Sequence, residues 1–231
     1  MTSASLEFRR LPDAAAVACE AAARVLERAR RAIAAGGRFR LVLAGGSTPI
    51  AAYRLLAGAA ADWSAWEVFF GDERCLAVDD PGRNGRAARE AWLAHVPISA
   101  EAIHEIPAEL GAKAAATRYD ALVAQSLPFD LVLLGMGEDG HTASLFPGRA
   151  IPEGRLAIPV HEAPKPPPER VSLTPAAFAG AGEILTLVTG AGKREAVRAW
   201  RAGIDLPIAR AAAAGPSLAL LDAAAWGEDE A

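Results

Sequence analysis

Asp139 and His141 lie two positions apart in the segment LLGMGEDGHTASLFP, which covers residues 133–147 and has three glycines before the histidine. The apolar run FDLVLL comes just before the first of these glycines and predicts a buried strand. A histidine can take up or release a proton near neutral pH, and a neighbouring carboxylate can orient it. The pattern predicts a proton-transfer site in a strand-end loop, and the two-residue spacing leaves direct contact between the two side chains open.

The segment FFGDERC, residues 69–75, places the ionisable residues Asp72, Glu73 and Arg74 directly after another predicted strand. On a solvated turn these residues would form a local ion pair that contributes little stability. In α/β proteins, however, ligands bind beyond the carboxyl ends of parallel strands. We therefore favour a functional role for this segment.

Two glycines, Gly45 and Gly46, precede Ser47 and Thr48 in the segment LAGGSTP, and Pro49 begins a predicted helix. The glycines let the backbone approach a ligand closely, and the N–H groups at a helix start favour an anion. The same residue types also suit an ordinary glycine turn with a Ser or Thr cap. The third glycine and the downstream acid of a dinucleotide fingerprint are missing. The segment alone leaves both interpretations open.

Lys193 follows a fourth predicted strand in the segment TGAGKREA, residues 189–196, at the start of a predicted helix. A nucleoside-triphosphate loop needs four residues between its glycines, so this activity is not predicted. The chain has only three lysines. A solvated lysine in a first helical turn would be disfavoured by the helix dipole, so we predict that Lys193 contacts an anion.

Apolar periodicity predicts helices alternating with strands along the chain. Asp13 is the expected N-cap of a helix over about residues 14–35, which Gly36 and Gly37 end. Strands are predicted at 38–44, 66–70, 129–135, 170–174, 183–190 and 217–222, and further helices at 50–58, 86–95, 112–125 and 193–203. Strands separated by helices pair in parallel, with both faces of the sheet covered. We expect one α/β domain over residues 1–231, with three α/β/α layers and a mainly parallel sheet.

The composition excludes several classes of protein. A hydrophobic fraction of 52% in 231 residues predicts a packed globule, and no apolar run approaches the roughly 18 residues that a bilayer crossing needs. The net charge of −4 argues against nucleic-acid binding. Cys19 and Cys75 form no disulfide framework and no metal-ligand cluster. The first residues lack the order of a signal peptide, so we expect a cytoplasmic protein.

Five segments together resemble the 6-phosphogluconolactonases in order and approximate spacing. They are LAGGSTP, FFGDER, GMGEDGHTASLFP, KPPPERVSLT and TGAGKREAV, and the resemblance runs from Leu41 to the terminal ALLDAAAW. It implies a Rossmann-like domain that hydrolyses 6-phospho-D-glucono-1,5-lactone in the oxidative pentose phosphate pathway, without a metal or organic cofactor. The chain departs from the family in having Ala77 where proline is frequent, and Arg83 before Asn84 where serine is common.

The resemblance and the residue types together suggest roles. His141 would act as base and then as acid, Asp139 would orient it or the water, and Arg74 would stabilise negative charge on the carbonyl oxygen. Further residues are expected to bind the substrate, chiefly its phosphate: Gly45, Gly46, Ser47, Thr48, Asp72, Arg170 and Lys193. The sequence leaves open whether Asp72 or Asp139 matters more.

Two other functions compete with the lactonase. In a glucosamine-6-phosphate deaminase of the same fold, the acid equivalent to Asp72 would move a proton at the sugar C2. Arg74 replaces the tyrosine usual in that family, and ASLFP replaces its AFNEP-like ending. A sugar-phosphate sensor would carry a DNA-binding segment, and no basic helix-turn-helix is present. We expect a small-molecule sugar-phosphate lactone as partner, with no nucleic acid and no membrane, and the residues allow a monomer while leaving the oligomeric state open.

Overall fold

The main sheet of the protein has seven parallel strands in the order β1-β10-β9-β6-β2-β3-β5. A computed structural model describes residues 5–227. The strands of this sheet are β1 (Leu6–Leu11), β2 (Phe39–Leu43), β3 (Trp66–Phe70), β5 (Ile103–His104), β6 (Leu131–Gly135), β9 (Ile184–Val188) and β10 (Ser217–Asp222). The predicted α/β class with a mainly parallel sheet is confirmed.

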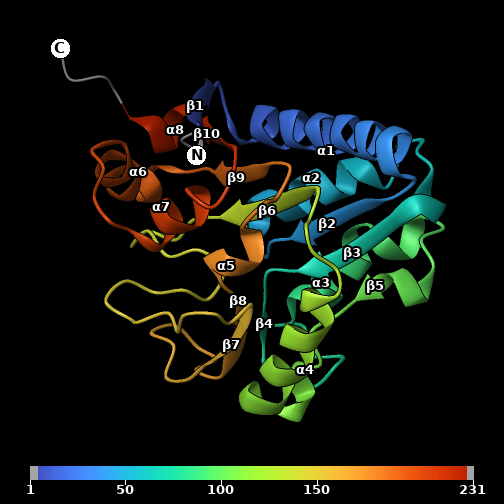
Figure 1. The fold of residues 1–231 in the computed structure, drawn as a ribbon. Coiled ribbons are helices and arrows are strands. Elements are labelled where there is room, and N and C mark those ends of the chain that lie inside the picture. Colours follow the sequence, from blue (N-terminus) through green and yellow to red (C-terminus); the bar gives the residue numbers. More distant parts are fainter. Residues whose placement is uncertain (1–4, 228–231) are drawn as a thin grey trace.

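Helices cover both faces of this sheet, as Figure 1 shows with α1 and α2 on one side and α6 and α7 on the other. The Asp13 side chain accepts a hydrogen bond from the Ala16 N–H and caps α1, and Gly37 ends that helix in the left-handed conformation. The helices are α1 (Ala14–Gly36), α2 (Ser47–Leu56), α3 (Asn84–Ala91), α4 (Ala112–Ala124), α5 (Pro175–Phe178), α6 (Arg194–Arg201), α7 (Pro207–Ala212) and α8 (Ala223–Trp226). Short 3₁₀ turns lie at Trp63–Ala65, Leu93–His95, Ala100–Ala102, Ala108–Leu110 and Ala191–Lys193.

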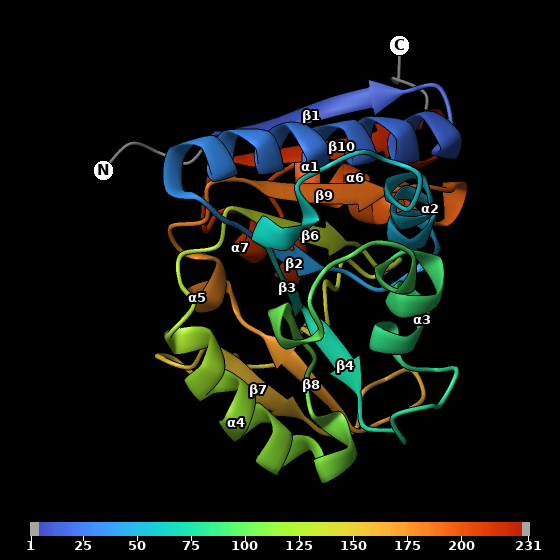
Figure 2. The ribbon, with the colours of Figure 1, turned by 90° about the vertical axis from the view of Figure 1, so that its right-hand side faces the viewer.

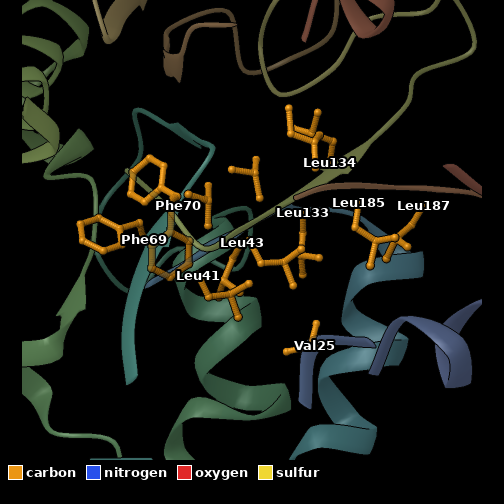
Figure 3. Close-up of a cluster of buried hydrophobic side chains, with 14 of the residues drawn as sticks. Val25, Leu41, Leu43, Phe69, Phe70, Leu133, Leu134, Leu185 and Leu187 are labelled. Atoms are coloured by element: carbon orange, nitrogen blue, oxygen red, sulfur yellow. The ribbon is translucent and has the colours of Figure 1, made fainter. Parts of the chain in front are cut away.

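The central strands form the core because their side chains are apolar on both faces. Leu41 in β2, Leu133 in β6 and Leu185 in β9 are each fully buried, and Figure 3 shows them packed beside Phe69 and Val25. Burying one such side chain stabilises the fold by about 1.5–3 kcal/mol. A packed core beneath the strand ends gives the loops that follow them a rigid base.

A second, smaller sheet contains three antiparallel strands, β4 (Asp72–Arg74), β8 (Arg170–Leu173) and β7 (Ala157–Val160), in the order β4-β8-β7. Helix α4 packs against β7 and β8, as Figure 2 shows. The expectation that residues 170–174 join the parallel sheet was therefore wrong, and so was the assignment of Asp72–Arg74 to a loop. The cause is non-local pairing, since each strand satisfies its backbone groups with the other.

Gly71 connects the two sheets. Its N–H donates to the Leu43 carbonyl at the end of β2, and its carbonyl accepts from the Leu173 N–H of β8, at 2.8 Å in both cases. The chain thus passes from β3 into β4 with its backbone bonded on both sides. Within residues 5–227, none of the helices combines the length and apolar character that a bilayer crossing requires.

Candidate active site

A cavity of about 380 Å³ lies beyond the carboxyl ends of β2, β3, β6 and β9. Its lining includes nine of the ten site residues predicted from the sequence: Gly45, Gly46, Ser47, Thr48, Asp72, Arg74, His141, Arg170 and Lys193. Asp139 is the tenth and does not line the cavity, but it contacts His141. The four predicted strand-end loops therefore meet at one place.

Asp139 orients His141. The Asp139 Oδ1 lies 2.5 Å from the His141 Nδ1 and also accepts the backbone N–H of His141 at 3.2 Å. Partial burial raises the pKa of Asp139, but the hydrogen bonds and charge of His141 outweigh this effect, so the pKa lies below its ordinary value. An ionised carboxylate can only accept hydrogen bonds, so Nδ1 carries the ring proton. The His141 Nε2 is left with a free lone pair and can act as a base.

The glycines of this loop make the arrangement possible. A Cβ on Gly137 would lie 2.0 Å from the His141 Nδ1 and 2.7 Å from the Asp139 Oδ1, so only glycine leaves room for the pair. The Gly137 N–H also donates to the His141 carbonyl at 2.8 Å. Phe146 packs against the imidazole with ring centroids 4.9 Å apart. The histidine is thus held from three sides by its own segment.

Arg74 and Arg170 are directly opposed across the β4–β8 pair, and both line the cavity. Directly opposed residues on antiparallel strands project to the same face. The Arg74 Nη1 donates to the Gly82 carbonyl at 2.5 Å, while its buried Nε finds no hydrogen-bond partner among residues 5–227. Two adjacent guanidinium groups create a strongly positive wall, and Arg74 has donor capacity left for an anion.

Arg170 is more fully engaged. Its guanidinium donates to the carbonyls of Lys165 at 2.8 Å, Pro167 at 3.0 Å and Pro166 at 3.4 Å. Burial lowers the pKa of Arg170 and the charge of Arg74 acts in the same direction, whereas Asp72 opposes both. An arginine stays charged in this situation. Its contribution to an anion site is accordingly its charge, together with the support that it gives to the proline-rich loop before β8.

Asp72 is buried at the wall of the cavity, and both of its carboxylate oxygens are occupied. Oδ1 accepts from the Asn84 Nδ2 at 3.0 Å, and Oδ2 accepts from the Ser144 hydroxyl at 2.6 Å. A Cβ on Gly45 would lie 2.2 Å from the Asn84 side chain, so this glycine makes space for the amide. The three side chains join β4, the start of α3 and the loop after β6, and Asn84 lies against Gly45 in the loop after β2.

The neighbouring Glu73 anchors the start of α3. Its carboxylate accepts the backbone N–H groups of Asn84 and Gly85, both at 2.8 Å, and lies 3.4 Å from the buried Arg83 guanidinium. Burial raises the pKa of Glu73, although these N–H donors and Arg83 act against that rise. Arg83, a departure from the family pattern, therefore fills a structural position and supports Asn84 indirectly.

An anion cradle, by which we mean Gly46, Ser47, Thr48 and Lys193, forms another part of the lining. Gly46 has φ of 105°, a conformation that favours glycine, and it precedes the first residue of α2. The free N–H groups of that helix start suit a negative charge. The Thr48 and Thr189 hydroxyls lie 2.6 Å apart and tie this loop to the loop that carries Lys193.

Hydrogen bonds to Asp222 also hold the loop that carries Lys193. Asp222, at the end of β10, accepts the Gly190 N–H at 3.0 Å through Oδ1, and the same oxygen caps α8 by accepting from Ala225 at 2.7 Å. Lys193 ends the 3₁₀ turn Ala191–Lys193 and directly precedes α6, one position from where the sequence placed it. Lys193 thus lies in a short turn between the Gly190 N–H, which Asp222 binds, and the start of α6.

Among the residues of the site that sequence reasoning missed are Asn84, Ser144, Phe146, Lys165 and Thr189. Ser144 and Phe146 lie in the glycine-rich segment already singled out, so proximity to His141 was the available signal. Lys165 could have been found by its rarity, since it is one of three lysines. Among residues 5–227 there is no group of three or more His, Cys, Asp or Glu side chains arranged to hold a metal ion.

The fold and this site define a class of sugar-phosphate enzymes. The sequence model of the glucosamine-6-phosphate isomerases/6-phosphogluconolactonases matches residues 12–219, and the chain belongs to this family. Within the family, the chain is 38% identical over 239 residues to the 6-phosphogluconolactonase of Mycobacterium tuberculosis, covering 95% of this chain and 96% of that protein. It is 39% identical to that of Streptomyces coelicolor, covering 89% and 87%.

Solved structures agree on the fold. The 6-phosphogluconolactonase of Trypanosoma brucei superposes with a TM-score of 0.83 at 27% identity, covering 95% of this chain and 97% of that one. A monomeric glucosamine-6-phosphate deaminase reaches a TM-score of 0.82 at 21% identity, covering 95% and 98%. The backbone alone therefore does not separate the two activities, and the side chains of the cavity must do so.

Proposed function

We propose that this protein hydrolyses 6-phospho-D-glucono-1,5-lactone to 6-phospho-D-gluconate, the second step of the oxidative pentose phosphate pathway. One observation carries the proposal: a histidine oriented by a carboxylate shares a cavity with an arginine that has a free donor and with an anion cradle. Lactone hydrolysis requires a base, a site for negative charge on the carbonyl oxygen, and a hold on the phosphate. The relatives named above carry the same activity in their names.

The reaction follows from the free Nε2 of His141. This nitrogen removes a proton from water as the water oxygen attacks the lactone carbonyl carbon, and Arg74 stabilises the resulting oxyanion. The tetrahedral intermediate then expels the ring oxygen, and His141 returns the proton to it. The products are a carboxylic acid, which ionises in water, and a free hydroxyl. Asp139 stabilises the imidazolium while it carries the proton.

Substrate orientation depends on the anion cradle. A phosphate monoester carries about −1.5 to −2 charge at neutral pH and offers three strong acceptor oxygens. The N–H groups at the start of α2, the hydroxyls of Ser47 and Thr48, and the Lys193 ammonium supply hydrogen-bond donors and a positive charge. Binding the phosphate in this cradle would fix the lactone relative to His141 and Arg74.

Deaminase chemistry is the second candidate, since a protein of that activity has the same fold. It would use Asp72 to move a proton at the sugar C2. Here both oxygens of the Asp72 carboxylate already accept hydrogen bonds from Asn84 and Ser144, which suits a positioning role better than that of a base. The lactonase is therefore the better supported function.

The two functions are separated by one pair of assays. Proton release is followed from freshly generated 6-phosphogluconolactone, with spontaneous hydrolysis subtracted, and ammonia release is followed from glucosamine 6-phosphate. We expect enzyme-dependent acceleration with the lactone alone. Ammonia from the amino sugar, without any gain on the lactone, would overturn the assignment.

We further infer a cytoplasmic enzyme whose residues 1–231 form one domain. The bonds of Gly71 to both sheets support the second inference, because they leave the small sheet continuous with the large one. A single cooperative unfolding transition seen by both fluorescence and circular dichroism would agree with it, whereas two separate transitions would contradict it.

A further inference from the structure

Lys165 lies in the proline-rich loop between β7 and β8 and lines the same cavity as the anion cradle. The cavity wall carries four cationic side chains, from Arg74, Lys165, Arg170 and Lys193, and among the lining residues only Asp72 opposes them. The functional roles given above account for the other three cations. Lys165 has none so far.

Hydrogen bonds hold the backbone of Lys165, whereas its side chain is exposed. The buried Arg170 guanidinium donates to the Lys165 carbonyl at 2.8 Å and to the next carbonyl at 3.4 Å. The Lys165 side chain is 57% exposed. Because the lysine side chain is long and solvated, its ammonium group can change partners without any change in the backbone.

In this structure the Lys165 ammonium pairs with Glu138. Its Nζ lies 3.7 Å from the Glu138 Oε2, and the Glu138 side chain is 64% exposed. Exposed ion pairs of this kind contribute little, because solvent screens both charges and two long side chains must be held in one geometry. A phosphate dianion with more charge and more acceptor atoms would compete well for the same ammonium.

Glu138 is placed to hold Lys165 near the cradle. Its Oε1 lies 3.1 Å from the position that a Cβ on Gly192 would occupy, so the carboxylate sits against the residue that precedes Lys193. Glu138 also directly precedes Asp139 in the loop of His141. The Lys165–Glu138 pair therefore spans from the small sheet to the loops of both functional groups.

We propose that Lys165 is a further substrate-binding residue, which Glu138 holds while the site is empty and which transfers to the phosphate when substrate enters. This inference rests on the proposed function, since it concerns the phosphate of the same substrate class. Glu138 then acts as an internal competitor that weakens phosphate binding. Removing the Lys165 charge should therefore weaken phosphate binding, and removing the Glu138 charge should strengthen it.

The test measures binding of 6-phosphogluconate, the stable product, by calorimetric titration, with gluconate as the ligand that lacks phosphate. Lys165→Met keeps the apolar stem and removes the charge, and should raise the Kd of 6-phosphogluconate roughly three- to tenfold. Glu138→Gln should lower that Kd about 1.5- to threefold. Gluconate binding should not respond to either change. An unchanged Kd in Lys165→Met would overturn the proposal.

The double variant separates competition from simple charge repulsion. If Glu138 acts by holding Lys165, then Glu138→Gln has no effect once Lys165→Met is present. If Glu138 merely repels the phosphate, its substitution lowers the Kd equally in both backgrounds, and the competitor role is wrong. Lys113→Met in α4 and Glu153→Gln in the loop before β7 are matched controls outside the cavity lining, and neither should change the Kd.

Product binding and turnover keep this proposal apart from the proposed function. If the wild-type protein binds 6-phosphogluconate but does not accelerate lactone hydrolysis, the function fails while the binding test still applies. With turnover of the lactone present, Lys165→Met should raise KM and leave kcat within about twofold. A fall in kcat at constant KM would move Lys165 to the reacting centre and contradict the transfer.

Discussion

The reacting group and the anion cradle meet at the cavity but are held in different ways. Side-chain contacts hold the reacting group, which consists of Arg74, Asp139 and His141, because Asp139 binds the imidazole and the Gly82 carbonyl binds Arg74. The anion cradle instead relies on backbone N–H groups at the start of α2 and on a bond between two hydroxyls. The reacting group depends on individual side-chain atoms, whereas the anion cradle depends mainly on the backbone conformation of its loops.

This difference has a consequence for substitutions. A group that acts through single side-chain atoms loses its function when one atom is removed, and the loss appears in kcat. The anion cradle binds through several N–H groups, hydroxyls and one ammonium. Removing one of these donors therefore removes only part of the binding free energy, and the loss appears in KM. Substitutions in the two groups should therefore differ in which kinetic constant they change.

His141→Asn should have the largest effect. Removing the general base should lower kcat by about 10²–10⁴, while the protein folds normally because asparagine has similar bulk and the ring faces the cavity. Steady-state kinetics with the phosphorylated lactone, together with circular dichroism, give both results.

The kcat of the wild-type protein should show no titration of Asp139 between neutral and mildly acid pH. The pKa of Asp139 lies below its ordinary value, so this carboxyl stays ionised as pH falls from neutral through mildly acid conditions. Rapid lactone self-hydrolysis confines the measurement to that range. A folded His141→Asn enzyme with near wild-type kcat would make Asp72 or Asp139 the candidate base and break the division between the two groups.

Arg74→Ala should have the next largest effect, a fall of about 10²–10³ in kcat, if its guanidinium meets the oxyanion. Arg74→Lys keeps the charge but loses the planar set of donors, including the contact to Gly82, so it should not restore the rate. Both variants are assayed with and without the substrate phosphate. A normal kcat with a raised KM would instead place Arg74 with the anion cradle.

Much of this site could be predicted because parallel strands end at one edge of a sheet. An apolar run followed by polar residues marks each of the segments that contain Gly45, Asp72, His141 and Lys193, and the sheet then brings these segments together. The roles of the individual side chains remain predictions, since they depend on a bound substrate. The local pattern of apolar and polar residues is therefore enough to predict where each strand ends and which residues follow it.

Long-range pairing could not be read from local patterns. The charged residues Asp72–Arg74 have no strand-like periodicity, and they become a strand only because β8 supplies partners about 100 residues later in the chain. Strand β1 is equally obscure, since LEFRRL at the sheet edge shows only weak alternation. The hydrogen bonds of Asp72 to Asn84 and Ser144 likewise depend on where α3 and the loop after β6 are placed.

Lys193→Ala should affect binding more than chemistry. A charge-assisted contact is worth about 1.5–3 kcal/mol, so KM for the phosphorylated lactone should rise about tenfold or more while kcat changes little. Glucono-1,5-lactone, which lacks the phosphate, should be nearly indifferent to the change. Equal losses on both substrates would show that Lys193 has another role and that the cradle is not specific for phosphate.

Thr48→Val should give the smallest effect and the sharpest view of the cradle. Valine keeps the branched shape and removes the hydroxyl that lies 2.6 Å from the Thr189 hydroxyl. A neutral hydrogen bond contributes about 0.5–1.5 kcal/mol, so KM should rise by roughly two- to tenfold at unchanged kcat. Thr189→Val is the matched variant, because it removes the other half of the same contact.

The pair of variants distinguishes two ways in which Thr48 could act. If its hydroxyl contacts the phosphate, Thr48→Val raises KM more than Thr189→Val, because it loses both the ligand contact and the link between the loops. If the hydroxyl only links the two loops, each variant raises KM equally, and the double variant is no worse than either one. The second result would assign phosphate binding to the backbone N–H groups, Ser47 and Lys193. The Thr48 hydroxyl would then only hold the two loops in the positions that the cradle needs.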